Sequence, residues 1–181
     1  MMKIFRLLAA LLDYPNDEFL AALREMAGND ARAFVDGLDE ENVLDADEAG
    51  QIAEFITAML AAEPLELQGT YVQCFDLTAE HSLHLTHHLF GEEKTRGPAL
   101  IDLGEFYQSY GLKVDEKELP DYLPVMLEFV STIELDEARV FLADVAKVLK
   151  VLADNLEKSG SDHAKLVRII EKQGSLARLA A

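Results

Sequence analysis

Residues 136–158 read DEARVFLADVAKVLKVLADNLEK, and their apolar side chains recur at the spacing of an α-helix. The i, i+4, i+7, i+8 pattern places these side chains on one helix face. The residues that follow it are Phe141, Val145, Val148, Leu149, Leu152 and Leu156. The stretch therefore predicts a long amphipathic helix with one buried face.

The same spacing recurs along most of the chain, and the turns between the periodic segments are short. The further predicted helices are 4–11, ended by Pro15; 19–26, closed by Gly28-Asn29; 52–60, ending before Pro64; 97–110, between Gly97-Pro98 and Gly111; and about 161–170. No segment has the alternating pattern of a strand, and Asp36-Gly37 lacks flanking strand residues. We predict an all-α fold, a single-domain helical bundle spanning residues 1–181, with residues 111–119 as an exposed connection.

Composition limits the partners of this chain. It has 34 acidic and 16 basic residues and a formal charge of -18. Such a charge repels phosphate backbones and anionic lipids, so we expect neither nucleic acid nor membrane surface as a partner. The acidic residues either form a solvated surface or attract a cationic partner.

The lone cysteine and the hydropathy pattern bear on location. Cys74 cannot form an internal disulfide, which fits a reducing compartment, so we expect a cytoplasmic protein. No apolar run approaches the ~18 residues that span a bilayer, so no stable membrane insertion is expected.

Motifs of catalysis are absent from the sequence. It has no phosphate-binding glycine loop, no nucleophile elbow and no EF-hand pattern. We therefore expect a protein that is not an enzyme and that has no cofactor of its own.

Histidines cluster in the middle of the chain. On a helix, His81, His84 and His88 would share one face, with His87 turned partly aside. Such a set could bind zinc or nickel, could pack or cap within the fold, or could contact a partner in a pH-dependent way. A small metal-binding protein is therefore one alternative function.

Two further features offer both a structural and a binding interpretation. In the run ELPDYLP, Asp121 as N-cap would put Pro124 at the third helical position, with Leu123, Leu127 and Val130 facing the core and Glu128 on a flank. Tyr71, Val72 and Phe75 have helical spacing and belong either to the core or to the wall of a groove. A groove of this kind binds an amphipathic helix, and acidic residues at its rim favour a basic one.

Four segments in order resemble those of nitrate reductase molybdenum cofactor assembly chaperones, the NarJ type of the TorD-like redox-enzyme maturation chaperones. The segments are RLLAALLDYP, PLELQGTYVQCFDL, HLFGEEKTRGPALIDL and ELPDYLPVMLEFVS, within residues 6–131. The resemblance implies an all-helical chaperone for the catalytic (alpha) subunit of respiratory nitrate reductase. It implies binding of the subunit's N-terminal amphipathic segment, help with cofactor insertion and membrane docking, and a monomer or weak homodimer. A chaperone for another molybdoenzyme is the related alternative.

The resemblance also implies which residues contact the partner. The family often has His after the Pro-Asp pair, where this chain has Tyr122. The positions matched by the family's segments include Gly91 and Gly97. The expected peptide-binding residues are Tyr71, Phe75, Asp76, His88, Arg96, Tyr107, Asp121, Tyr122, Leu123, Leu127 and Glu128.

Overall fold

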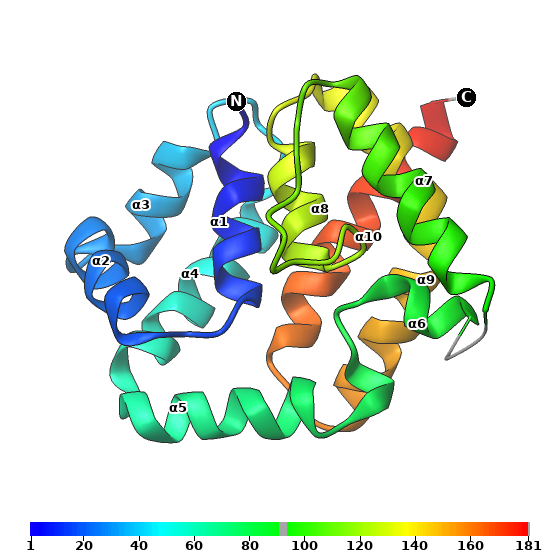
Figure 1. The fold of residues 1–181 in the computed structure, drawn as a ribbon. Coiled ribbons are helices and arrows are strands. Elements are labelled where there is room, and N and C mark those ends of the chain that lie inside the picture. Colours follow the sequence, from blue (N-terminus) through cyan, green and yellow to red (C-terminus); the bar gives the residue numbers. More distant parts are fainter. Residues whose placement is uncertain (91–93, 181) are drawn as a thin grey trace.

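The computed structural model describes residues 1–90 and 94–180, and all regular elements in these ranges are helices (Figure 1). The α-helices are α1 (Lys3–Leu12), α2 (Asp17–Ala27), α3 (Ala31–Leu38), α4 (Ala46–Ala61), α5 (Pro64–Tyr71), α6 (Leu85–Phe90), α7 (Arg96–Ser109), α8 (Leu123–Val130), α9 (Leu135–Lys158) and α10 (His163–Ala180). A π-helical turn (Val72–Asp76) and a 3-10 turn (Ala79–His81) connect α5 to α6. The predicted all-α fold is confirmed. None of the described helices is long and apolar enough to cross a membrane.

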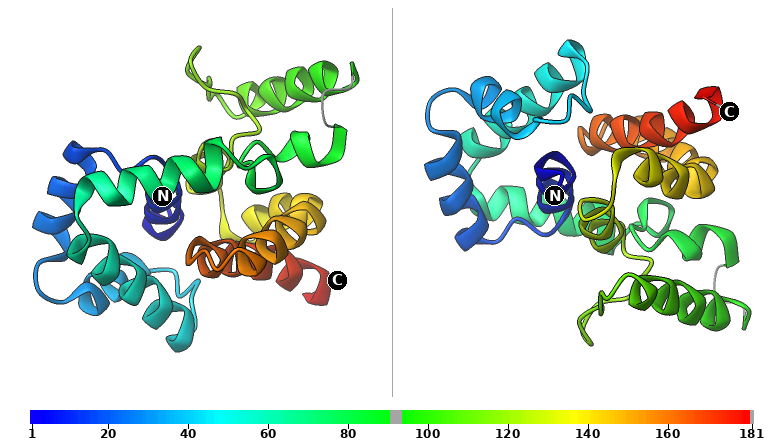
Figure 2. Two further views of the ribbon diagram at one scale, coloured as in Figure 1. Left: turned by 90° about the horizontal axis from the view of Figure 1, so that it is seen from below. Right: turned by 90° about the horizontal axis from the view of Figure 1, so that it is seen from above.

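Helices α1 and α8 form the centre of the molecule. The views from below and above show α1 in the middle, with α2, α3 and α4 on one side and α7 and α9 on the other (Figure 2). α1 packs against α8, in which Leu123, Leu127 and Val130 are fully buried, as their spacing predicted. Each such apolar side chain contributes roughly 1.5–3 kcal/mol when it leaves water. The Met2 amide also donates to the Ser131 carbonyl oxygen at 2.7 Å, which joins the start of α1 to the end of α8.

Helices α9 and α10 form a close antiparallel pair. The turn between them contains Gly160, whose positive φ of 75° suits glycine. Gly174 allows the two backbones to approach, because a Cβ atom there would lie 2.6 Å from the Leu142 carbonyl oxygen. At the other side of α10, Lys172 Nζ lies 2.7 Å from Asp45 and 2.9 Å from Glu48, which ties α10 to the start of α4.

Helix boundaries follow the sequence signals in most places. The six helices predicted from apolar spacing correspond to α1, α2, α4, α7, α9 and α10. Residues 111–119 form a non-helical and mostly exposed connection, as predicted. α3 was not predicted. Its N-cap Asp30 accepts a hydrogen bond from the Ala33 amide, and Asp36-Gly37 lies inside the helix instead of forming a turn.

The predicted start of α8 was wrong by one residue. Tyr122 is the N-cap, so Pro124 is the second helical residue and not the third. The Asp121 carboxylate does not cap α8, because it is turned toward Thr86 and accepts hydrogen bonds there. Pro124 remains compatible with the first turn, where its missing amide has no intrahelical acceptor.

The expected helix carrying three histidines is also not observed. His81 ends the 3-10 turn, His88 lies in α6, and residues 82–84 between them are not helical. His84 instead forms an antiparallel bridge with Tyr122. The Leu85 amide donates to the Asp121 carbonyl at 3.0 Å, and the Leu123 amide donates to the Leu83 carbonyl at 2.8 Å. This pairing prevents a continuous helix through the histidine cluster. We call segments 83–86 and 121–123 together the paired ridge.

Candidate functional site

Four of the residues predicted to bind a peptide meet in one depression, which we call the aromatic cleft. The cleft has a volume of about 240 Å³. Its lining residues are Tyr14, Tyr71, Phe75, Asp76, Leu83, His84 and Tyr122. The predicted residues among them are Tyr71, Phe75, Asp76 and Tyr122, which come from two segments about 50 residues apart in the sequence. The cleft lies on one side of the paired ridge, which supplies Leu83, His84 and Tyr122.

The π-helical turn after α5 positions the aromatic side chains of the cleft. Tyr71 ends α5 and Phe75 lies in the π-turn, and their ring centroids are 4.8 Å apart. Tyr14, which follows α1, packs edge-on against Tyr71 at 5.7 Å. His84 stacks on Tyr122 with centroids 5.0 Å apart. The cleft therefore has rigid aromatic walls, and aromatic pairs of this geometry contribute about 0.5–1.5 kcal/mol each beyond burial.

Hydroxyl groups orient the buried Tyr71 and the partly buried Tyr122. Tyr71 Oη donates to the Leu12 carbonyl at 2.8 Å, and Tyr122 Oη donates to Asp13 Oδ1 at 2.9 Å. The two phenolic oxygens are 3.3 Å apart. Burial raises the pKa of both phenols above their ordinary value, so both hydroxyls stay protonated at neutral pH. These bonds fix the end of α1 to α5 and to the paired ridge.

Asp121 is the polar centre of the paired ridge and is only 1% exposed. Its Oδ2 accepts hydrogen bonds from the Thr86 amide at 3.0 Å and from Thr86 Oγ1 at 2.6 Å. Arg96 Nη2 lies 3.6 Å from Oδ2, and His84 Nδ1 lies 3.5 Å from Oδ1. Burial alone would raise the pKa of this carboxyl, but the contacts with His84 and Thr86 outweigh it and lower the pKa.

Arg96 completes this buried group, because its Nε donates to Thr86 Oγ1 at 2.9 Å. Arg96 is the first residue of α7, so the group connects α6, α7 and the residues just before α8. We call Thr86, Arg96 and Asp121 the buried polar node. Arg96 and Asp121 were predicted to contact the partner. The structure places them beside the aromatic cleft, where they hold its ridge. Gly91, matched by the resemblance, lies outside the described residues.

His81 and His88 have separate structural surroundings. His81 is buried, with Nδ1 at 2.9 Å from the Cys74 carbonyl and Nε2 at 3.3 Å from the Asn155 carbonyl. Burial lowers the pKa of His88, so its neutral ring donates from Nε2 to the Ser82 carbonyl at 2.7 Å. Within residues 1–90 and 94–180, no group of three His, Cys, Asp or Glu side chains could hold a metal ion.

The remaining predicted residues lie away from the aromatic cleft. Tyr107 and Glu128 line a different cavity of about 340 Å³ beside the 111–119 connection. Burial raises the pKa of Tyr107, whose hydroxyl donates to the Pro120 carbonyl at 2.8 Å. Leu123 and Leu127 are fully buried.

Two aromatic residues near the cleft were missed by sequence reasoning. Tyr14 lines the cleft, and in the sequence it lay in the segment RLLAALLDYP without being named among the expected binding residues. His163 packs edge-on against Phe75 at 4.9 Å and against Phe55 at 5.1 Å. Burial lowers the pKa of His163 to about 4, so its ring is neutral at pH 7. His163 lies far along the chain from the residues that line the cleft, so no local sequence pattern indicated that it packs beside them.

The chemistry of the cleft is that of recognition. The phenols of Tyr71 and Tyr122 stay protonated, because burial raises the pKa of both, and the aromatic faces of the cleft can receive apolar side chains. Asp76 adds a carboxylate, and His84 adds a half-exposed imidazole. Large aromatic surfaces beside a few polar groups are typical of sites that anchor a peptide.

Comparisons with known proteins agree on one group. A family model described as "Nitrate reductase delta subunit" matches residues 40–166. The nitrate reductase molybdenum cofactor assembly chaperone NarJ of Escherichia coli (strain K12) is 29% identical over 171 residues, covering 94% of this chain and 69% of that protein. The probable NarJ chaperone of Bacillus subtilis (strain 168) is 31% identical over 166 residues, covering 92% of this chain and 85% of that protein. The probable chaperone NarW of Escherichia coli (strain K12) is 33% identical over 157 residues, covering 87% and 62% respectively.

Proposed function

Because this chain belongs to the nitrate reductase delta subunit family, we propose that it is an assembly chaperone for nitrate reductase and not an enzyme. The resemblance of its four sequence segments to such chaperones is confirmed by these matches. The single observation that carries the proposal is the similarity to named assembly chaperones over most of the chain. Those relatives are named for molybdenum cofactor assembly, and we extend that role to this chain.

The client in this proposal is the catalytic subunit before it contains its cofactor. The chain binds the N-terminal amphipathic segment of that subunit, keeps the subunit competent for molybdenum cofactor insertion, and assists assembly of the membrane complex. It acts in the cytoplasm as one all-helical domain, as a monomer or weak homodimer. Cys74 is a free cysteine, so the fold does not depend on a disulfide that a reducing compartment would break. This supports the proposed location.

The aromatic cleft is the proposed contact for the client segment. Tyr71, Phe75 and Tyr122 give it preformed walls, so little conformational entropy is lost when an apolar side chain enters. The net charge of -18 favours a basic segment at a diffusional encounter. Leu123 and Leu127, included in the predicted set, support the cleft from the core and do not reach the peptide in this proposal.

The alternative of a histidine-based metal protein has little support. His81, His84 and His88 belong to different local structures, and the described residues form no metal-binding group. A chaperone for another molybdoenzyme stays the main competing function, because cleft chemistry alone does not identify the client. The experiment therefore needs peptides from both kinds of client.

Calorimetric titration of the full chain tests the proposal. The ligand is a peptide copying the first ~15 to 20 residues of the cognate catalytic subunit, which spans about 22–30 Å as a helix. Saturable binding that weakens between about 0.05 and about 0.3 M salt is expected, because charges are screened. Tighter binding of the matching peptide from another molybdoenzyme would move the assignment to that client.

A matched pair of variants tests the position of the site. Tyr14 is 41% exposed in the cleft, whereas Tyr110, the residue just after α7, is 40% exposed and lines no part of the cleft. Tyr14→Ala should weaken binding by up to about 2 kcal/mol, roughly 30-fold in Kd, if it is an anchor. Tyr110→Ala should leave Kd within about twofold. Equal effects of the two variants would remove the aromatic cleft from the proposal.

A further inference from the structure

A second depression lies between α7 and α9 and is lined by other residues of the paired ridge than the aromatic cleft. Its volume is about 320 Å³, and its lining is mainly apolar. The apolar side chains that line it are Leu85, Leu89, Leu103, Phe106, Met126, Phe141, Val145 and Val148. We call it the α7–α9 groove. None of the residues that line it lines the aromatic cleft, although Thr86 and Asp121 of the ridge reach its base.

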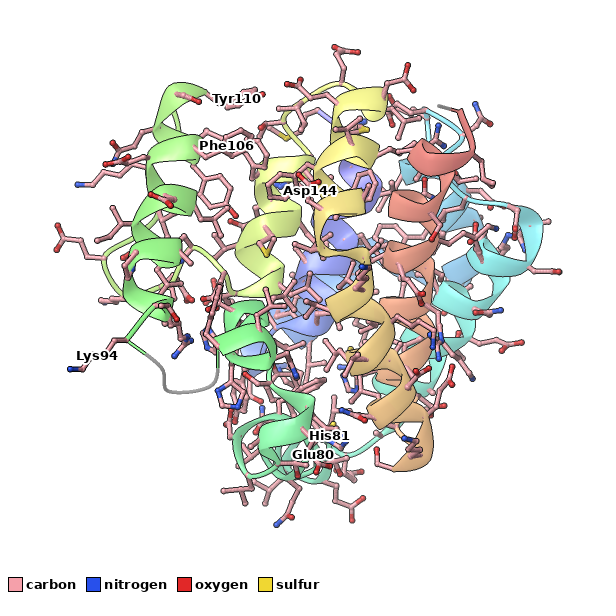
Figure 3. All side chains as sticks on the ribbon, turned by 90° about the vertical axis from the view of Figure 1, so that its right-hand side faces the viewer. Glu80, His81, Lys94, Phe106, Tyr110 and Asp144 are labelled. Carbon is pink, nitrogen blue, oxygen red and sulfur yellow. The ribbon has the colours of Figure 1, made fainter. Side chains whose placement is uncertain are left out.

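Helix α7 is attached to the molecule near its two ends, which leaves the groove between the attachments. At its first residue, Arg96 joins the buried polar node. Near its last turn, Phe106 stacks on Phe141 with centroids 5.7 Å apart, and Tyr107 packs against Phe129 at 4.9 Å. Figure 3 shows α7 standing to one side, with Phe106 pointing from it toward α8 and α9. The contacts at both ends of α7 thus hold the walls of the groove in place.

We propose that the α7–α9 groove is a second docking surface, which receives an amphipathic helix with an apolar stripe flanked by lysine or arginine. The inference rests on the proposed function in one respect, because the docking helix is taken to be a segment of the client protein. The groove and the aromatic cleft share the paired ridge, so one client can contact both surfaces.

Apolar exposure supports an occupant for the groove. Leu89 on α6 is 61% exposed at its edge, and Phe106 on α7 is also exposed. Together with Leu103 and Val145 these side chains form one continuous apolar surface in a concave site. Contiguous apolar surface of this kind on a folded protein marks an interaction site more often than a scattered apolar residue does.

The charge of the groove selects the occupant. Asp102 on α7 and Asp144 on α9 line opposite walls, and both side chains are exposed. Within the described ranges, neither carboxylate has a hydrogen bond or an ion pair. Lys147, one turn after Asp144, does not line the groove. A basic partner would pair with both carboxylates, whereas a second copy of this chain would bring another charge of -18 and be repelled.

Backbone chemistry favours a helix over an extended peptide. An extended segment normally binds by adding to the edge of a sheet, and no sheet occurs in the described residues. In an apolar groove its amides and carbonyls would be left without partners, and such burial is costly. A helix satisfies its own backbone and presents apolar side chains at i, i+3, i+4 and i+7 along one stripe.

Calorimetric titration with exposed-charge variants of the full chain tests the inference. One probe is the reductase N-terminal peptide, and the other is a designed leucine–lysine helix of about 18 residues, roughly 27 Å long. The double variant Asp102→Asn/Asp144→Asn should bind both probes about tenfold more weakly and with a smaller salt dependence. The control double variant Glu105→Gln/Asp136→Asn removes the same charge from the same two helices, outside the groove, and should stay within about twofold.

A second pair of variants tests the apolar contact without changing charge. Leu89 is 61% exposed in the groove, and Ile101 is 62% exposed on α7 outside its lining. Leu89→Ala should weaken binding about fivefold or more, and Ile101→Ala should leave it within about twofold.

The outcomes separate this inference from the proposed function. If both peptides bind and neither groove variant differs from its control, the groove is not a docking surface, while the chaperone function stands. If only the designed helix binds, and binds through the groove, the inference holds and the nitrate reductase client is wrong. If neither peptide binds the wild-type chain, both are overturned.

Discussion

Replacing Asp121 by alanine should destabilise the fold strongly, because this carboxylate is the centre of the buried polar node. The substitution removes the acceptor for the Thr86 amide and hydroxyl, at 3.0 and 2.6 Å. It also leaves the Arg96 guanidinium, 3.6 Å away, without its carboxylate. Three donors from α6 and α7 therefore lose their partner in a site where Asp121 is almost inaccessible to water.

The magnitude follows from these contacts. Each hydrogen bond to a charged group contributes about 1.5–3 kcal/mol, and removal of one partner from a buried ion pair costs about 3–5 kcal/mol. Relief of the desolvation of Asp121 offsets part of this loss, so we expect a cost of about 3 kcal/mol for Asp121→Ala. For a chain of this size that corresponds to a Tm lower by roughly 6–12 °C.

Thermal and urea unfolding of purified variants measure this effect. Asp121→Asn keeps an acceptor oxygen but loses the charge, and should cost about 1–2 kcal/mol. Asp102→Ala removes an exposed carboxylate and should change stability by less than about 0.5 kcal/mol. Equal unfolding midpoints for Asp121→Ala and Asp102→Ala would show that the Asp121 carboxylate does not stabilise the fold.

The pH dependence of the same variants gives an independent check. The pKa of Asp121 is lowered in the folded state, so its stabilising contribution is present above the ordinary pKa of 3.8 and is lost as pH falls through the folded pKa. The stability difference between wild type and Asp121→Ala should therefore shrink only below about pH 4. If the stability difference between wild type and Asp121→Ala disappears between pH 7 and 5 instead, it arises from a group other than the Asp121 carboxyl.

Further predictions concern packing and titration elsewhere in the fold. Gly174→Ala should destabilise by about 1–3 kcal/mol in urea unfolding, because its Cβ would lie 2.6 Å from a backbone oxygen of α9. Gly104→Ala, with no atom within 4 Å of the new Cβ, should instead stabilise α7 by about 0.5–1 kcal/mol. Equal loss of stability in Gly174→Ala and Gly104→Ala would contradict the close approach of the α9 and α10 backbones at Gly174. Leu123→Ala, at a fully buried position, should cost about 2–5 kcal/mol by the same assay, and a cost below about 1 kcal/mol would argue against its core position. NMR titration should give His163 a pKa of about 4, and wild type should lose more stability than His163→Gln between pH 6.5 and 4, because only the unfolded ring takes up a proton there. A His163 pKa near 6.5 would show that the ring is solvated.

Much of the helical fold was predictable because apolar spacing records which face each helix buries. The stripe in 136–158 matches α9, which buries Val148, Leu149, Leu152 and Leu156 as predicted. Phe141 and Val145 are only partly buried, and the buried Leu142 was not part of the predicted stripe. α3 was missed because it buries only Val35 and contains Asp36-Gly37, so eight residues gave too weak a periodic signal. Local signals report local structure and weaken where a helix is short.

The error at Asp121 has a different cause. An aspartate before a proline-containing helix start resembles an N-cap, and local sequence gives no reason to choose otherwise. The alternative partner, Thr86, lies 35 residues earlier in the chain. The paired ridge that brings them together also separates His81, His84 and His88, whose common helical face was expected from spacing alone. In both cases, the side chain of Asp121 and the placement of the three histidines, contacts between residues far apart in the sequence determined the structure.

The candidate site was partly predictable. Resemblance to a chaperone family indicated Tyr71, Phe75 and Asp76, and Tyr122 was predicted with them although the family often has His at its position. The structure brings these four into one cleft. Spacing alone could not indicate Tyr14, because it follows α1 and reaches the cleft only through the packing of α1 on the rest of the fold. Whether these residues bind the client stays a prediction for the peptide titration.

Molybdenum content of nitrate reductase is the most direct test of the central claim. The reductase would be isolated from cells that lack this chain and from cells in which the full chain has been restored, and molybdenum would be measured per catalytic subunit. We expect a reductase that is poor in molybdenum when the chain is absent and that contains its full molybdenum when the chain is restored. Equal molybdenum content and equal activity in both preparations would contradict the proposed role in cofactor assembly.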